Sequence, residues 1–187
     1  MMMENLGIKY LALLRGINVG GKNIISKDEL HQAFKALGFS NILTYIQSGN
    51  ILFRGKDPDP ESHTKNIETL LSQRFHYNAR AVIYSENKFK SIINEAPDNW
   101  GKDDRYRHRI FFLLGDVTPK EIMKHFGSSK KEVETITLGS KVIYSSVSKD
   151  LVAKSVLRKF PMTPAYQQVT VRNQNTVYKL SKLFEDI

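Results

Sequence analysis

The chain has 187 residues, 41% of them hydrophobic and 25% charged, which is ordinary for a globular protein with one good-sized domain or two small ones. It has no cysteine, which excludes a disulfide framework, thiolate chemistry and cysteine-based zinc sites. The net charge of +9 is uneven, because residues 1–100 hold 12 basic and 10 acidic side chains whereas residues 101–187 hold 16 and 9. A basic half favours acidic partners such as nucleic acid or phosphorylated small molecules.

The start of the chain and the length of its apolar runs indicate where in the cell the protein is expected. Met1–Ile8 lacks the basic region and apolar core of a signal peptide. No apolar run approaches the roughly 20 residues that a membrane span needs. We therefore expect a soluble, cytoplasmic protein with no membrane partner and no cofactor, and we leave its oligomeric state open.

The first half of the chain alternates strand and helix patterns. A capping box at Ser26-Lys27-Asp28-Glu29 predicts a helix that ends at Gly38, and Asp59-Pro60 predicts the start of another. Ser85 can cap a third helix, which ends before Pro97. The predicted strands are 8–14, 42–46, 51–53 and 79–84, the middle two forming a hairpin around residues 47–50.

The same order returns after a polar stretch that contains the only tryptophan, Trp100. A second capping box at Thr118-Pro119-Lys120-Glu121 predicts a helix, a stripe at 151–160 predicts another, and Thr176 is the expected cap of a last one. The predicted strands are 109–114, 133–138, 142–146 and 166–171.

Both halves therefore have the order β-α-β-β-α-β followed by a helix, which is the split βαβ or ferredoxin-like unit. We predict an α+β fold of two ferredoxin-like subdomains, with antiparallel sheets that carry helices on one face. The predicted bounds are residues 1–97, a linker or long loop at 98–107, and residues 108–187 with the C-terminal helix.

The stretch Tyr10–Asn23 is the most distinctive of the sequence, because an apolar run meets an arginine and a glycine-rich loop. Residues 16–22 match G-x-x-x-x-G-K, but Asn23 stands where a P-loop needs Ser or Thr, and the next helix begins only after Ser26. This disfavours a nucleotide triphosphatase. An anion-binding loop of another kind and a tight connection made of turn-forming residues both stay open.

Three segments carry a resemblance to a known family: Leu14–Asn23 (LRGINVGGKN), Thr44–Asn50 (TYIQSGN), and Thr170–Thr176 with Lys179-Leu180. They closely resemble the signature segments of a bacterial family known as domain of unknown function 1697, although that family often has tryptophan where this chain has Gln174. The resemblance implies a cytoplasmic protein of ferredoxin-like subdomains. It implies no activity and no catalytic residue.

The polar segments at strand ends are the candidate ligand-binding site. Arginine forks suit phosphate or carboxylate, and amides and glycine N–H groups add neutral donors. The five histidines show no metal-ligand spacing, so we expect no metal and leave the catalytic residues unassigned. The candidate residues are Arg15, Gly16, Asn18, Gly20, Gly21, Lys22, Asn23, Gln47, Asn50, Arg172, Asn173 and Asn175.

Three functions fit these observations. The first is binding of nucleic acid by the basic half, although strand 51–53 lacks the RNA-recognition motif of ferredoxin-like sheets. The second is a small phosphate-ester or anhydride enzyme, and the third is an interaction protein without a small ligand. The first two share an anionic, phosphate-bearing ligand at the loop Arg15–Asn23, which is our prediction.

Overall fold

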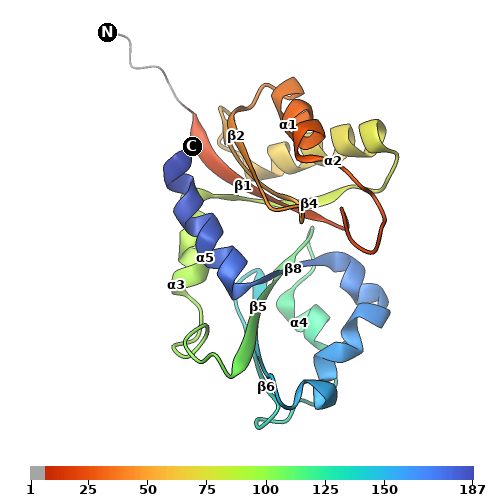
Figure 1. The fold of residues 1–187 in the computed structure, drawn as a ribbon, viewed down its shortest axis with the longest axis vertical. Helices are drawn as coiled ribbons and strands as arrows, with labels where there is room; N and C mark the ends of the chain where they lie inside the picture. The colour runs from red at the N-terminus through yellow and green to blue at the C-terminus, as the bar shows by residue number, and fades with distance from the viewer. Residues whose placement is uncertain (1–6) are drawn as a thin grey trace. The chain divides into compact units, whose positions relative to one another are not determined.

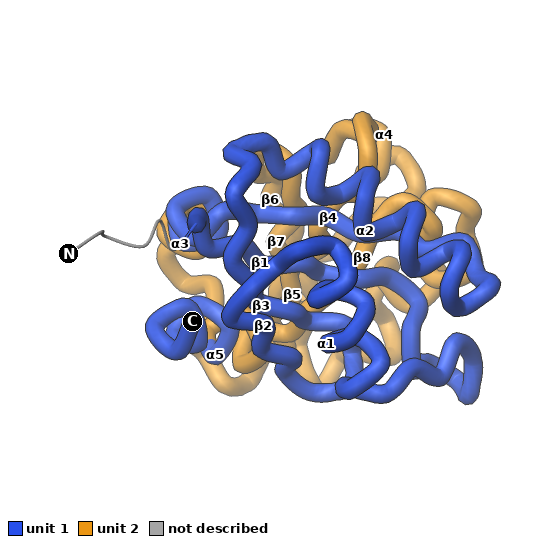
Figure 2. Tube along the Cα trace, turned by 90° about the horizontal axis from the view of Figure 1, so that it is seen from above, with its two compact units in different colours: residues 1–90, 179–187 blue, residues 91–178 orange. Residues whose placement is uncertain are grey.

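The computed structural model describes residues 7–187, so the signal-peptide prediction for Met1–Ile8 lies mostly outside the described residues. The chain forms two compact units (Figure 2). Unit 1 comprises the chain up to Lys90 together with Lys179–Ile187, and unit 2 comprises Ser91–Tyr178. Among residues 7–187, no helix is both long and apolar enough to cross a bilayer.

Unit 1 is built on a four-stranded sheet with the order β2-β3-β1-β4, in which every pair is antiparallel. The register places Leu13 opposite Asn50 and Arg15 opposite Arg80. Helices α1 and α2 cover one face of this sheet (Figure 1). The elements are β1 (Ile8–Arg15), α1 (Lys27–Ala36), β2 (Ser40–Tyr45), β3 (Asn50–Gly55), α2 (Pro60–Phe75) and β4 (Arg80–Ser85).

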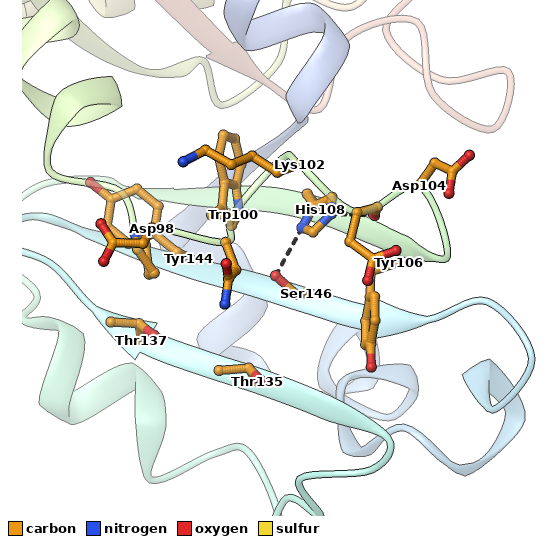
Figure 3. A pocket seen from close by; sticks show the side chains of 13 residues that line it. Asp98, Trp100, Lys102, Asp104, Tyr106, His108, Thr135, Thr137, Tyr144 and Ser146 are labelled. Atoms are coloured by element: carbon orange, nitrogen blue, oxygen red, sulfur yellow. Dashed lines mark hydrogen bonds between the residues drawn. The ribbon is translucent and has the colours of Figure 1, made fainter.

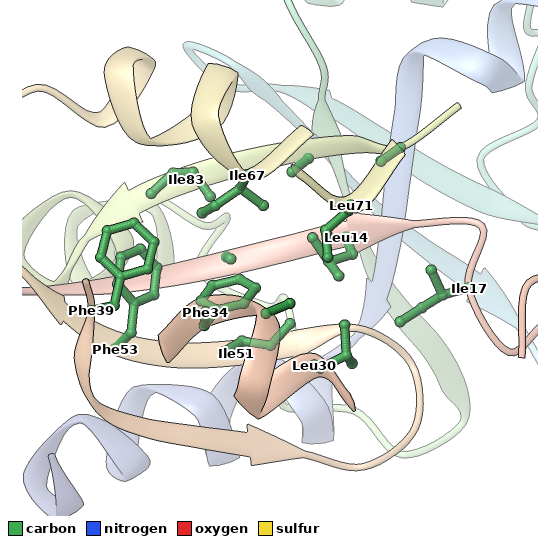
Figure 4. Close-up of a cluster of buried hydrophobic side chains, with 14 of the residues drawn as sticks. Leu14, Ile17, Leu30, Phe34, Phe39, Ile51, Phe53, Ile67, Leu71 and Ile83 are labelled. Carbon is green, nitrogen blue, oxygen red and sulfur yellow. The ribbon is translucent and has the colours of Figure 1, made fainter. Parts of the chain in front are cut away.

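The core of unit 1 lies between this sheet and its two helices (Figure 4). Strand alternation turns Tyr10, Ala12 and Leu14 toward α1 and α2. Phe34 of α1 and Ile67 of α2 are fully buried against them. Each such side chain contributes about 1.5–3 kcal/mol through burial. The predicted capping box of α1 is confirmed, because Ser26 and Glu29 bond to each other's backbone N–H groups.

The opposite face of the unit 1 sheet is also apolar, since Leu11 and Leu13 are fully buried. Tyr84 of β4, opposite Leu11, contacts Phe89 of α3 (Glu86–Asn94), and Phe89 contacts Phe184.

The end of the chain belongs to unit 1, whereas the sequence grouped residues 108–187 together. Lys9 Nζ donates to the Phe184 carbonyl at 2.5 Å, and Arg54 Nη2 donates to the Ile187 carbonyl at 3.0 Å. These contacts, with that of Phe184 on Phe89, are the physical reason for the difference.

Unit 2 has a second four-stranded antiparallel sheet, with the order β6-β7-β5-β8. The register pairs His108 with Ser146 and Arg109 with Asn173. The elements are β5 (Tyr106–Leu113), α4 (Pro119–Met123), β6 (Glu134–Leu138), β7 (Val142–Ser148) and β8 (Val169–Asn173). Helix α5 (Gln174–Leu183) begins in this unit and belongs to unit 1 from Lys179. The predicted α+β class with antiparallel sheets is thus confirmed in both units.

The predicted helix at 151–160 is wrong. The chain instead makes four short 3₁₀ helices, at Val152–Lys154, Val156–Arg158, Phe160–Met162 and Pro164–Gln168. Ser155 interrupts this segment with extended backbone. Its hydroxyl donates to buried Glu134, and Glu134 also accepts from the Val156 N–H. Phe160 still packs into the core of this unit, so the stripe marked the buried face correctly.

Two smaller predictions also need correction. The last helix is capped by Asn173, whose Oδ1 accepts from the Thr176 N–H at 2.9 Å, because the helix begins at Gln174. The polar stretch 98–107 is not merely a surface loop. Trp100 is only 3% exposed, and its Nε1 donates to the Ser145 carbonyl at 3.3 Å.

Candidate functional site

The glycine-rich loop that follows β1 adopts the left-handed backbone that its residue types favour. Gly16, Asn18, Gly20, Gly21 and Asn23 all have φ between 48° and 73°. An isolated bridge between Val19 and Lys22 closes the tip, which is exposed. The loop is thus a compact turn and does not begin a helix at Lys22, in contrast to a P-loop.

The amides of this loop bind the loop itself. Asn18 Nδ2 donates to the carbonyls of Ile25 and Gln47 at 2.9 and 2.8 Å, and Asn18 Oδ1 accepts from the Ile25 N–H at 2.9 Å. Asn23 Nδ2 donates to the Gly16 carbonyl at 2.8 Å. Both donors of Asn18 are therefore used, whereas Lys22, Asn23 and the backbone of Gly20 and Gly21 are exposed.

The second predicted segment is also held internally. Asn50 is buried, and its Nδ2 donates to the Tyr45 carbonyl and to Ser48 Oγ at 3.1 and 2.9 Å. Gln47 contributes its backbone carbonyl to Asn18, which joins the two predicted segments of unit 1. The amide of Asn50 therefore shapes the β2–β3 turn.

The third predicted segment lies in unit 2. Arg172 is 7% exposed, and one of its nitrogens, Nη1, donates to Thr170 Oγ1 and to the Val171 carbonyl at 2.8 and 2.9 Å. Burial lowers the pKa of Arg172 to about 10, so the side chain still carries its charge at neutral pH. Asn173 caps α5 and Asn175 is exposed in its first turn.

A cavity of about 830 Å³ lies elsewhere in unit 2, over one face of its sheet (Figure 3). Its floor comes from β5, β6 and β7, through His108, Thr135 and Ser146. Its wall is the segment 97–104, which Trp100 fixes to the sheet. The volume falls within the range of small-molecule sites.

The hydrogen bonds of His108 define the chemistry of this cavity. His108 is 6% exposed, with Nε2 2.8 Å from the Asp103 carbonyl and Nδ1 2.8 Å from Ser146 Oγ. A carbonyl only accepts, so in the neutral ring Nε2 must carry the proton and Nδ1 must be the acceptor. The Ser146 hydroxyl therefore donates to the imidazole, which is how a base activates a serine.

The charges around this cavity are mostly negative. Asp98, Asp103 and Asp104 line it against one lysine, Lys102. Arg105 donates from its side chain and its backbone to Asp103, with Nη2 2.7 Å from Oδ2, and this lowers the pKa of Asp103 to about 2. The cavity therefore suits neutral or cationic molecules better than phosphates.

A second hollow, of about 450 Å³, lies where β8 ends and α5 begins. Strand β5 runs from Tyr106, but its pairing with β8 starts only at Arg109, which leaves room beside the first residues of β5. The lining has four cations against two carboxylates, a surplus of +2: Lys102, Arg107, Arg109 and Lys149 against Asp103 and Asp104. Asn173 and Asn175, which the sequence predicted as ligand-binding residues, also line this hollow.

Comparison with known proteins assigns the chain to a family. The family model described as "Protein of unknown function (DUF1697)" matches residues 8–144. The chain belongs to the DUF1697 family. The resemblance that the signature segments suggested is thus confirmed, although the third segment lies beyond the matched residues.

A solved structure is similar to this DUF1697 protein over nearly its whole length. It is described as the structure of conserved bacterial protein SP0830 from Streptococcus pneumoniae, and it has a TM-score of 0.82 and 24% sequence identity. The match covers 95% of this chain and 98% of that one, and it shows a shared fold. No curated protein sequence matches the chain.

Sequence reasoning missed the cavity of this DUF1697 protein. It found no metal-ligand spacing among the five histidines, left the catalytic residues unassigned, and did not single out His108 or Ser146. The sequence held one signal for the cavity wall, which is the single tryptophan, Trp100, in a polar stretch. Such a large apolar side chain indicates that the stretch packs against the rest of the protein. Among residues 7–187, no three His, Asp or Glu side chains gather in a way that could hold a metal ion.

Proposed function

We propose that this protein binds an anionic, phosphate-bearing small molecule in the 450 Å³ hollow at the start of α5. One observation carries the proposal: the lining has a surplus of two positive charges beside a helix N-terminus. Backbone N–H groups at a helix N-terminus and basic side chains both attract phosphate.

The residues of this hollow have different proposed roles. Arg109 and Lys149 supply the charge, and Asn175 supplies an exposed amide in the first turn of α5. Asn173 has its Oδ1 committed to the cap, and its Nδ2 is the group that can donate to a ligand. Arg172 takes a structural role, because its side chain is buried. The glycine-rich loop offers exposed Lys22 and backbone groups, but its Asn18 amide is committed to the loop itself, so it is the second candidate.

The fold also has a finer assignment that we propose. Both units are ferredoxin-like subdomains, and the strand orders β2-β3-β1-β4 and β6-β7-β5-β8 support this. In unit 2 the 3₁₀ segments take the place of the second helix. We further propose that the protein is bacterial and cytoplasmic, on the strength of its signature segments.

The test is titration calorimetry with inorganic pyrophosphate and with a nucleoside diphosphate. Arg109→Ala and Lys149→Ala should each weaken binding about 10- to 100-fold, since a charge-assisted hydrogen bond contributes about 1.5–3 kcal/mol. Lys22→Ala is the matched control, because Lys22 is an exposed cation of the glycine-rich loop. If Lys22→Ala alone weakens binding, the loop is the site. If neither probe binds at low salt, the proposal is wrong.

Nucleic acid is the other phosphate-bearing partner that the basic half allows. Fluorescence anisotropy with labelled single-stranded DNA and RNA separates the two cases. Binding by phosphate contacts weakens linearly in log salt and is insensitive to sequence. If the protein binds the single-stranded DNA or RNA tightly and does not bind pyrophosphate, the proposed ligand becomes nucleic acid in place of a small molecule.

A further inference from the structure

We propose that Ser146 is the nucleophile, and His108 the general base, of a hydrolytic site for uncharged carboxylic esters in the 830 Å³ cavity of unit 2. The 830 Å³ cavity and the proposed anion site adjoin and share five lining residues: Lys102, Asp103, Asp104, Tyr106 and His108. The inference is nevertheless tested separately from the anion site, because neither the substrate nor the probe needs a phosphate. It rests on three structural observations: the hydrogen-bonded chain, the cavity that it faces, and the charges that line that cavity.

The chain of contacts has the order that nucleophilic catalysis needs. Ser146 Oγ lies 2.8 Å from His108 Nδ1, and His108 Nε2 lies 2.8 Å from the Asp103 carbonyl, which fixes the ring and its tautomer. Asp103 is itself held by Arg105, through the guanidinium and the backbone N–H. The serine, the base and an orienting acceptor therefore stand in line, as in serine hydrolases of unrelated folds.

The reaction needs only an ester and water. Ser146 Oγ bonds to the acyl carbon while its proton passes to His108 Nδ1, and the alkoxide then leaves and takes that proton as an alcohol. Water next attacks the acyl-serine and gives one proton to Nδ1. Ser146 Oγ leaves with that proton, so one ester and one water become one acid and one alcohol.

The charges of the site favour this cycle. When His108 is protonated, its Nε2–H still donates to the Asp103 carbonyl. The Asp103 carboxylate also attracts the imidazolium, since the two groups interact electrostatically. The three aspartates against one lysine in the cavity disfavour an anionic acyl group or phosphate, which selects a neutral or cationic ester.

The backbone N–H groups of β7 do not supply the donor to the developing oxyanion. Strand β7 lies between β6 and β5, so its backbone N–H groups serve the two ladders. Thr135 is the cross-strand partner of Ser146 and also lines the cavity. Directly paired residues have Cβ atoms about 4.5–5.5 Å apart, so a carbonyl bonded to Ser146 can reach the Thr135 hydroxyl. We assign this hydroxyl as the oxyanion donor.

The decisive experiment is covalent labelling with a fluorophosphonate probe, followed by peptide mass spectrometry. It is paired with hydrolysis of p-nitrophenyl butyrate, which is an uncharged ester. The wild-type protein should be labelled at Ser146. Ser146→Ala should abolish labelling and lower hydrolysis about 100-fold or more, and His108→Gln should do the same by removing the base. Thr135→Val should keep the label but lower hydrolysis about 100-fold.

Ser148→Ala is the matched control, because Ser148 points to the same face of β7 but pairs with Tyr106. It should be labelled and active like the wild type. The proposal is overturned if Ser146 is not labelled in the folded wild-type protein. It is also overturned if His108→Gln is labelled as strongly as the wild type. If circular dichroism shows that His108→Gln does not fold, the comparison of Ser146→Ala with Ser148→Ala still tests whether Ser146 is the nucleophile. Loss of pyrophosphate binding in Arg109→Ala leaves these outcomes unchanged, so the two proposals fail separately.

Discussion

Replacing Asn18 by glycine tests whether the glycine-rich loop is a self-contained turn or an open ligand site. Asn18 has φ 53° and its side chain makes three hydrogen bonds, to Ile25 N, Ile25 O and Gln47 O. Glycine accepts this φ without strain, so the substitution removes the three bonds and adds the conformational entropy of a glycine. At about 1 kcal/mol each, the loss in unfolding free energy is about 3 kcal/mol.

Asn23 provides a control of matched geometry. It has φ 48° and one side-chain bond, from Nδ2 to the Gly16 carbonyl at 2.8 Å. Asn23→Gly should therefore cost about 1 kcal/mol, and the entropy effect of the new glycine is the same in both variants. The two variants should differ by about 2 kcal/mol, or about 1 M in the urea midpoint at a typical slope.

The assay must report on unit 1. Trp100 is the only tryptophan and belongs to unit 2, so its fluorescence does not follow the loop. Urea unfolding followed by far-UV circular dichroism, with hydrogen exchange of peptides from residues 8–55, reports the change. Equal midpoints for Asn18→Gly and Asn23→Gly would refute the reasoning. The Asn18 amide would then be available to a ligand, and the loop would become the first candidate site.

Two further predictions concern backbone and pH. Gly49→Ala should destabilise the fold far more than Gly20→Ala: both glycines have positive φ, but a Cβ at Gly49 would lie 2.7 Å from Leu14 Cβ whereas one at Gly20 meets nothing within 4 Å. We expect about 1 kcal/mol for Gly20→Ala and at least about 3 kcal/mol for Gly49→Ala, measured by urea unfolding; equal costs would contradict the geometry. Burial raises the pKa of Tyr77 and Tyr144 to about 12, from 10 for an ordinary tyrosine. A raised pKa stabilises the fold fully below pH 10, and this contribution is lost as pH rises through 12. Absorbance at about 295 nm should show both phenols ionising late, and Tyr77→Phe with Tyr144→Phe should remove that late phase; a titration unchanged by both substitutions would contradict it.

Much of the architecture could be predicted because it depends on local patterns. The capping boxes at Ser26 and Thr118 marked the starts of α1 and α4, since each is a contact between residues three apart. The apolar run at residues 11–14 marked β1, because a strand that is buried on both faces is apolar along its length. The prediction of a helix at residues 151–160 was wrong because a long-range hydrogen bond, from Ser155 to Glu134, competes with local helix propensity.

The sequence by itself determined that the glycines and asparagines after β1 form a left-handed turn, because those residue types adopt that backbone at low cost. It could not determine whether their amides face a ligand or the carbonyls of the loop. Only the tertiary structure decided this, and only it placed His108 against Ser146, 38 residues away. That contact depends on the register of β5 with β7, and a shift by one residue would turn Ser146 to the other face of the sheet.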